Sequence, residues 1–156
     1  MTIRFMLDTN MVIYIIRHKP ESVLEHFQQY DPAEFCISAI TLAEMQYGIS
    51  KSSKPEKNQL ALASFLSNIA VLPFEEDAAV EYGDIRSGLE KKGTAIGPND
   101  MLIAAHARAL DLTVVTNNTK EFVRVPGLKL DNWTKGTCNR IVKSKESVDK
   151  LRGLIV

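Results

Sequence analysis

Residues 3–10 read IRFMLDTN, a mainly apolar run that stops at the carboxylate of Asp8. A short apolar run of this kind is typical of a strand that is buried on both faces of a parallel sheet. A short helix is expected next, over residues 10–17, with Asp8 or Thr9 near its N-terminal cap. The stretch therefore predicts a buried strand whose carboxyl end presents an acidic side chain.

Outward from this stretch, predicted strands alternate with predicted helices. Further strands are expected at residues 35–37, 71–74, 112–116 and 128–130. Helices are expected at residues 21–30, from a cap at Ser38 to about 49, at 55–70, at 77–92, from the turn at 97–100 to 110, and as a short turn through 121–122. This alternation predicts an α/β fold of parallel strands, joined by helical crossovers that cover both faces of the sheet.

The composition is that of one ordinary globular domain. The chain has 156 residues, of which 45% are hydrophobic and 24% are charged. No apolar run is long enough for a membrane span, and Asp8 comes too early for a secretory signal, so we expect a cytoplasmic protein that does not enter a membrane. Two cysteines are too few for a disulfide framework, and no glycine-rich phosphate-binding motif is present.

A formal net charge of zero hides an asymmetry along the chain. Residues 1–134 carry 13 Lys and Arg against 17 Asp and Glu, a net charge of −4, whereas residues 135–156 carry 6 against 2, a net charge of +4. We therefore expect a main domain at 1–134 and a basic C-terminal tail at 135–156. The tail is either loosely held or a basic arm that contacts RNA or a partner chain. An acidic main domain that handles a polyanion needs a bound cation.

Three acids lie in apolar surroundings. Asp8 follows a buried strand, Asp100 opens a helix that is apolar nearly all round, and Glu44 has mainly apolar neighbours. Buried carboxylates need a neutralising partner, and none of the three motifs contains an obvious Arg or Lys. Mg²⁺ or Mn²⁺ would neutralise such a cluster, and phosphodiester hydrolysis is the reaction class that follows.

Each acid also has a simpler interpretation. Asp8 could only cap the helix that follows it, and Asp100 could be an acid favoured by the first turn of its helix. Glu44 and Glu121 could be ordinary surface residues.

Five stretches, in order, resemble the motifs of the PIN-domain family, in particular its VapC-type toxins. They are FMLDTNMVIYIIR (5–17), ISAITLAEMQYGI (37–49), IGPNDMLIAAHARAL (96–110), LTVVTNNTKEF (112–122) and VPGLKLDNW (125–133). The resemblance implies a three-layer α/β/α fold with a central four- or five-stranded parallel sheet. It also implies a PIN-like nuclease domain at 1–134 that uses Mg²⁺, with Mn²⁺ as a substitute, to cleave single-stranded RNA.

The same resemblance implies partners and a substrate. VapC-type toxins form homodimers, and the C-terminal segment of a VapB antitoxin blocks their active site. Members most similar to this chain cut tRNA anticodon loops, often that of the initiator tRNA. Candidate dimer contacts are the stretch 55–70 and the apolar side chains near Tyr14 and Ile15.

The resemblance assigns roles to residues. Asp8 and Asp100 are the expected principal metal ligands, and Glu44 completes the acidic cluster and helps to orient the nucleophile. Many members have aspartate where this chain has Asn118, so we expect Glu121 to turn toward the same site. The expected substrate-binding residues, which position ligands or contact phosphate and ribose, are Thr9, Asn10, Thr116, Asn117 and Asn118.

Two other functions stay open at this point. Asp8 followed by Thr9 and Asn10 faintly resembles the motif of phosphatases with an aspartate nucleophile, although those enzymes usually carry a second acid where this chain has Asn10. A non-catalytic RNA- or protein-binding module on the same scaffold is the second alternative. The presence of Asp8, Glu44 and Asp100 argues against it.

Overall fold

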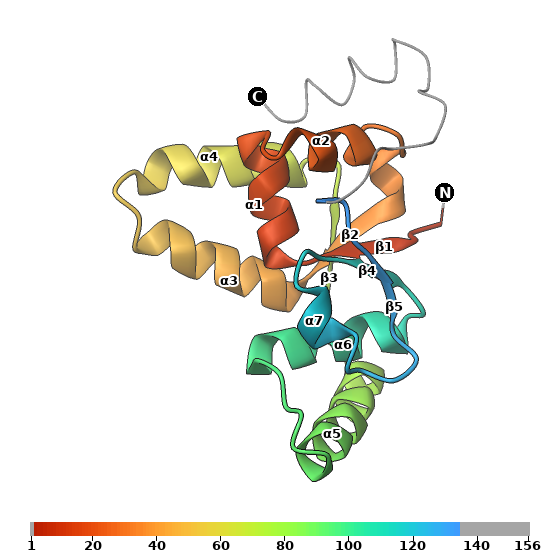
Figure 1. Ribbon diagram of the computed structural model, residues 1–156. Coiled ribbons are helices and arrows are strands. Elements are labelled where there is room, and N and C mark those ends of the chain that lie inside the picture. The colour runs from red at the N-terminus through yellow and green to blue at the C-terminus, as the bar shows by residue number, and fades with distance from the viewer. Residues whose placement is uncertain (1, 135–156) are drawn as a thin grey trace.

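The computed structural model describes residues 2–134 and contains one sheet of five parallel strands (Figure 1). The strands are β1 (Phe5–Leu7), β2 (Phe35–Ser38), β3 (Ala70–Leu72), β4 (Thr113–Val115) and β5 (Lys129–Asp131), and their order across the sheet is β3-β2-β1-β4-β5. The helices are α1 (Thr9–Arg17), α2 (Glu21–Phe27), α3 (Ala39–Ser50), α4 (Pro55–Leu66), α5 (Glu76–Lys91), α6 (Pro98–Ala109) and α7 (Thr119–Phe122), with a 3₁₀ turn at Pro32–Glu34. The predicted basic tail lies outside the described residues.

Strand β1 lies at the centre of the sheet, as its apolar sequence predicts. It pairs in parallel with β2 on one side and with β4 on the other. Successive side chains of a strand point to opposite faces of the sheet. Phe5 and Leu7 therefore join one hydrophobic core, whereas Met6 joins the other.

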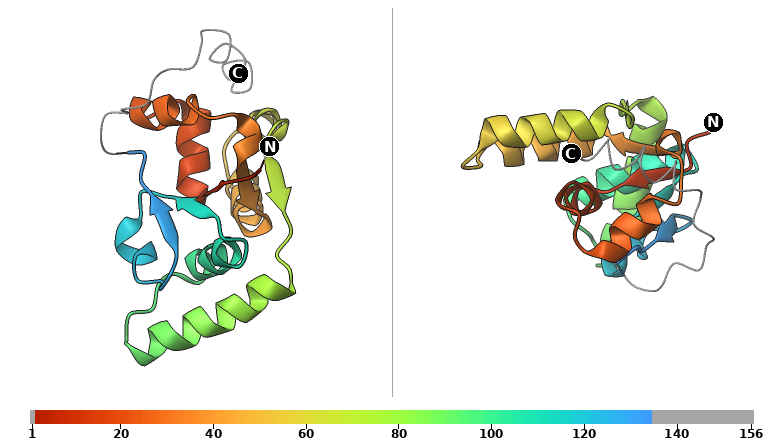
Figure 2. Two further views of the ribbon diagram at one scale, coloured as in Figure 1. Left: turned by 90° about the vertical axis from the view of Figure 1, so that its right-hand side faces the viewer. Right: turned by 90° about the horizontal axis from the view of Figure 1, so that it is seen from above.

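The two cores make the fold three layers deep. The first core packs α1, α2 and α4 against the sheet, and the second packs α5, α6 and α7 against its opposite face. Figure 2 shows α1 and α2 on one side of the strands and α5 and α6 on the other. The predicted three-layer α/β/α fold is therefore confirmed, with five strands. In the part of the chain that the structure describes, no helix is long and apolar enough to cross a membrane.

Trp133 closes the first core at the end of the described chain. Its side chain is fully buried, and its indole Nε1 donates a hydrogen bond to Asp131 Oδ2 at 3.0 Å. The ring stacks on Tyr30 and meets Phe5 and Phe35 edge to face. Residues after β5 therefore hold the apolar face of the first strand in place.

Several predicted element boundaries are wrong by a few residues. The helix expected at 55–70 ends at Leu66, and the strand expected at 71–74 spans Ala70–Leu72. Pro73 has no N–H for a strand ladder, so the strand ends before it. Helix α2 ends at Phe27 rather than at residue 30, and Pro32–Glu34 forms a 3₁₀ turn with a capping box that was not expected.

One predicted dimer contact is also wrong. Ile15 is completely buried in the first core, so its side chain is not available to a second copy of the chain. Apolar residues on the inner face of an amphipathic helix belong to its own domain.

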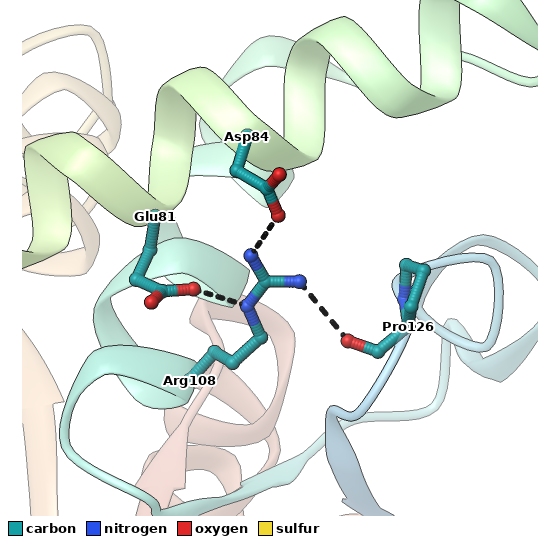
Figure 3. Close-up of polar contacts among 4 residues, drawn as sticks. All are labelled: Glu81, Asp84, Arg108 and Pro126. Carbon is teal, nitrogen blue, oxygen red and sulfur yellow. Dashed lines mark hydrogen bonds and ion pairs between the residues drawn. The ribbon is translucent and has the colours of Figure 1, made fainter.

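Arg108 on α6 ties three segments of the second layer together (Figure 3). Its guanidinium forms ion pairs with Glu81 and, at 2.6 Å, with Asp84, both on α5. It also donates a hydrogen bond to the Pro126 carbonyl at 3.1 Å, in the segment before β5. One planar cation therefore joins α5, α6 and the last crossover.

Replacing Arg108 with Met is expected to lower the free energy of unfolding by about 1–2 kcal/mol, because three partners lose a partly buried charged donor. Thermal or urea unfolding measures the change. Arg86→Met is the control, since Arg86 lies on the exposed face of α5 and pairs with Glu90 one turn away. Equal losses in the two variants would contradict a bridging role for Arg108.

Candidate functional site

The site lies at the carboxyl edge of the sheet, where β1 and β4 end side by side. Asp8 follows β1 and Thr116 follows β4, so parallel pairing of these strands brings the two residues together. The Thr116 hydroxyl donates a hydrogen bond to Asp8 Oδ2 at 2.5 Å. Asp8 Oδ1 accepts a second hydrogen bond from the Met11 backbone N–H at 2.9 Å and caps α1. The capping interpretation of Asp8 is therefore correct, and it is compatible with a second role.

Burial sets the charge of Asp8. The side chain is only 4% exposed. Loss of hydration raises the pKa of Asp8 to about 6, and the nearby charge of Glu44 adds to the rise. The hydrogen bonds from Thr116 and Met11 act in the opposite direction, since they stabilise the ionised form. Asp8 is thus a buried carboxylate held by neutral donors.

Asp100 lies in the first turn of α6 and is partly buried. Burial raises the pKa of Asp100 to about 7, together with a hydrogen bond to Glu121 and the charges of Asp8, Glu121 and Glu44. These influences show that the four acids share one neighbourhood. The structure therefore brings together all four acids that were proposed for the site.

Asn118 holds two of these acids in place. Its side-chain Nδ2 donates hydrogen bonds to Glu121 Oε2 at 2.8 Å and to Asp100 Oδ2 at 3.3 Å. Its backbone N–H donates to the Thr116 hydroxyl oxygen at 2.9 Å. Asn118 therefore bridges two carboxylates and also supports the hydroxyl that binds Asp8.

Glu44 approaches the site from the second turn of α3. Its Oε1 accepts a hydrogen bond from the Thr9 hydroxyl at 2.7 Å. Thr9 begins α1, directly after Asp8, so this contact ties α3 to the end of β1. Glu44 is partly buried, which places it between the interior and the solvent-facing side of the site.

The other predicted site residues differ in their surroundings. Asn117 turns away from the acids, and its Nδ2 donates to the Tyr14 hydroxyl at 2.9 Å. Asn10 is exposed on the first turn of α1. The proposed substrate-binding residues therefore divide into those that hold acids, namely Thr9, Thr116 and Asn118, and those that do not.

Within residues 2–134, no cationic side chain pairs with this cluster. The ion pairs within residues 2–134 involve other residues, and none includes Asp8, Glu44, Asp100 or Glu121. The groups that hold the carboxylates are hydroxyls and amides, which carry no net charge. Unpaired, partly desolvated carboxylates are costly unless a cation joins them or they take up protons.

The donor set fits a hard divalent cation. All the available side-chain donors are oxygens, which Mg²⁺ and Mn²⁺ prefer. Between residues 2 and 134, no three acidic, histidine or cysteine side chains are grouped so that they could hold an ion as they stand. Mg²⁺ typically keeps several waters and binds only one or two carboxylates, so it does not require a closed protein cage.

A groove leads away from the acids between α1, α3 and α4. Its volume is about 320 Å³. Acidic and hydroxyl groups, apolar side chains and basic side chains all line the groove; they include Thr9, Glu44, Ile16, Met45, Arg17 and Lys51. Sequence patterns did not predict this groove, because it is formed by three helices that are separated along the chain.

The fold and the acidic edge agree with comparisons to known proteins. The PIN domain family matches residues 5–128, and the chain belongs to this family. The predicted membership is thus confirmed. Nucleases of this family generally depend on a divalent metal ion.

The relatives of this chain include VapC proteins. The tRNA(fMet)-specific endonuclease VapC of Salmonella typhimurium is 45% identical over 131 residues, which cover 84% of this chain and 98% of the relative. Ribonuclease VapC2 of Rickettsia felis is 47% identical over 132 residues, with 84% and 98% coverage. The solved structure of DNA-bound VapBC from Salmonella typhimurium superposes with a TM-score of 0.80 at 45% identity, covering 85% of this chain and 99% of that one.

Asp8→Asn is expected to stabilise the metal-free protein at pH 8 by about 2 kcal/mol, because it removes a buried charge while retaining the shape of the side chain. Burial raises the pKa of Asp8 in the folded state to about 6 from its ordinary value of 3.8, so ionised Asp8 destabilises the fold above that range. The stability difference between variant and parent should therefore shrink as the pH falls from about 7 to about 4.

Unfolding in EDTA across this pH range measures the difference between Asp8→Asn and the parent. Asp111→Asn is the matched control, since Asp111 lies on the surface and makes an exposed ion pair with Lys129. A difference between Asp8→Asn and the parent that does not change with pH would contradict the raised pKa of Asp8.

Proposed function

We propose that this chain is the toxin of a type II toxin–antitoxin module and acts as a Mg²⁺-dependent endoribonuclease on single-stranded RNA. The observation that carries the proposal is the set of four carboxylates, from Asp8, Glu44, Asp100 and Glu121, that share one sheet edge and have no cationic partner among the described residues. Relatives that match 98% of their own length to this chain are named ribonucleases. Site and family therefore support the same activity.

Asp8 and Asp100 are the proposed principal metal ligands, and Glu44 is the third acid. A bound Mg²⁺ or Mn²⁺ would supply charge stabilisation for the attacked phosphate and would activate water. Glu44, held by Thr9, orients the attacking water. Thr116 holds Asp8 in its rotamer, and Asn118 fixes Asp100 relative to Glu121.

An aspartate nucleophile is less compatible with this sequence. Phosphatases of that kind usually carry a second acid two residues after the nucleophile, where this chain has the exposed Asn10. Each carboxylate oxygen of Asp8 accepts one hydrogen bond and keeps a second lone pair, which is available to a metal ion. Hydrolysis by water, with Asp8 as a ligand, therefore agrees better with these residues.

The proposed substrate is a tRNA anticodon loop, with the initiator tRNA as the first choice. The relative from Salmonella typhimurium is named a tRNA(fMet)-specific endonuclease, and so is the one from Shigella flexneri, which is 46% identical to this chain. A loop presents unpaired nucleotides, which can reach an acidic edge more easily than a duplex can.

The proposed regulator is a VapB-type antitoxin. Solved relatives are VapBC complexes from Rickettsia felis and Salmonella typhimurium. The groove between α1, α3 and α4 would accept a peptide segment, because apolar side chains line it and Glu44 is among its lining residues. A basic side chain at the end of such a segment would neutralise Glu44 and its neighbours in place of the metal.

A homodimer through the outer face of α3 and α4 belongs to the same proposal. Tyr47 and Leu60 are largely exposed on these two helices, at 67% and 73%. Large apolar side chains exposed on adjacent helices are typical of association surfaces. Leu60 also lies within the stretch 55–70 that was expected to mediate dimer contacts.

Asp8→Asn and Asp100→Asn are each expected to reduce RNA cleavage by at least about 100-fold, since each removes a proposed metal ligand. Cleavage of an anticodon stem-loop from the initiator tRNA is measured with Mg²⁺, with an elongator stem-loop as the comparison RNA. Asp111→Asn serves as the control. Full activity of Asp8→Asn, with EDTA harmless to the parent, would eliminate the metal mechanism.

Metal binding is tested separately from catalysis. Mn²⁺ or Mg²⁺ is expected to raise the melting temperature of the parent. An ion that binds only the folded state and is present at 100 times its Kd adds about 2.7 kcal/mol to the free energy of unfolding. Asp8→Asn should lose this shift, and Asp111→Asn should keep it. A parent that shows no shift with either ion would favour a non-catalytic module.

A further inference from the structure

A buried hydrogen-bonded network links the start of α3 to the last turn of α6. Nδ1 of His106 lies 2.8 Å from Oγ of Ser38. Both side chains are almost completely buried, with exposed fractions of 2% and 0%. Ser38 ends β2 and caps α3, because its Oγ accepts a hydrogen bond from the Ile40 backbone N–H at 3.1 Å. His106 also makes a hydrogen bond with the backbone of Pro73, just after β3.

The direction of each hydrogen bond follows from the chemistry of the groups. Proline has no backbone N–H, so the Pro73 carbonyl accepts and a ring N–H of His106 donates. A neutral imidazole has one donor and one acceptor nitrogen, so Nδ1 accepts a hydrogen bond from the Ser38 hydroxyl. Burial lowers the pKa of His106, although the charges of Asp77 and Glu75 act in the opposite direction. With the ring neutral, every polar group of this buried hydrogen-bonded network therefore has a partner. We name the network the Ser38–His106 bridge.

The bridge is placed symmetrically with respect to two of the acids. Glu44 comes six residues after Ser38 in α3, and Asp100 comes six residues before His106 in α6. Six residues of helix correspond to about 9 Å along the axis. Figure 1 shows α3 and α6 running in opposite directions, so both acids lie on the same side of the bridge.

The two acids are close enough to influence each other. The charge of Glu44 contributes to the raised pKa of Asp100. Helices α3 and α6 also contact each other directly. A sliding movement of one helix along the other would change the separation of these carboxylates, and the Ser38–His106 bridge is the buried polar contact that opposes it.

We propose that His106 is a positioning residue for the nuclease site, which sets the separation of Glu44 and Asp100 by fixing α3 against α6 through Ser38. This inference rests on the proposed nuclease function. Among the described residues, the imidazole interacts with Ser38, Pro73 and Phe74 and with none of the four acids, so it acts only through the two helices. A residue needed only to fill space could be replaced by an apolar side chain of similar size.

The test uses His106→Leu, which keeps an apolar side chain in the core, and Ser38→Ala, which keeps the imidazole. Ile103→Ala is the control, since Ile103 is fully buried on α6 outside the bridge and its truncation leaves a cavity. The Mn²⁺ concentration for half-maximal cleavage of a single-stranded RNA is measured, together with the Mn²⁺-induced shift in melting temperature without RNA. All measurements are made at a temperature where every variant is folded.

His106→Leu and Ser38→Ala are each expected to require about tenfold more Mn²⁺, because small displacements of catalytic groups have large effects. Ile103→Ala should keep the Mn²⁺ dependence of the parent, even though it is less stable. The double variant should need no more Mn²⁺ than the worse single variant, since both changes break one bridge. His106→Asn retains an acceptor near Nδ1 and should restore most of the Mn²⁺ affinity.

A Mn²⁺ dependence of His106→Leu equal to that of the parent would overturn the inference. The inference would also be overturned if Ile103→Ala required as much additional Mn²⁺ as His106→Leu does. An increase in the double variant equal to the combined increases of the two single variants would overturn it as well. If His106→Leu does not fold, Ser38→Ala decides the question alone. The nuclease function is judged on the parent protein: a parent that neither cleaves RNA nor binds Mn²⁺ refutes that function and the positioning role with it.

Discussion

The contact between Asp8 and Thr116 determines how the rest of the site is arranged. A carboxylate at the end of a strand buried on both faces loses most of its hydration, and this raises its pKa to about 6. Two hydrogen bonds, from the Thr116 hydroxyl and the Met11 N–H, keep the ionised form accessible. Parallel pairing of β1 with β4 is what places Thr116 beside Asp8. The sheet thus holds Asp8 at a buried position, where a carboxylic acid without these two hydrogen bonds would be harder to ionise.

Neutral donors distinguish this site from a structural ion-pair network. Arg108 shows what such a network looks like in the same protein, since it joins α5 and α6 by charge neutralisation. At the acidic edge, by contrast, hydroxyl and amide groups of Thr9, Thr116 and Asn118 hold the carboxylates. Such donors fix the geometry without neutralising the carboxylates, and the raised pKa values of Asp8 and Asp100 show that burial opposes their ionisation until a cation binds. Burying carboxylates without a cation lowers the stability of the fold, and such a loss of stability is common at functional sites.

The local elements could be predicted from the sequence, because apolar runs, caps and prolines act over short distances. The run before Asp8 predicted β1, and the order of strands and helices predicted the layers. The strand order and the hydrogen-bond partners could not be predicted, because they depend on contacts between distant residues. Asn117 turns to Tyr14 rather than to the acids, and Ser38 pairs with His106, which is 68 residues away. The structure gathers the four acids that the motifs singled out, while their catalytic roles stay proposals.

The order of the strands has a consequence for synthesis of the chain. Strand β1 is flanked by β2, which comes soon after it, and by β4, which comes more than a hundred residues later. The first two acids are therefore translated long before Asp100, Thr116 and the strand that bears Thr116. A nascent chain on the ribosome carries half of the acidic edge and no complete site. If these acids form the nuclease site that we propose, the site is completed only when the last strands have emerged, so an unfinished chain cannot cut RNA.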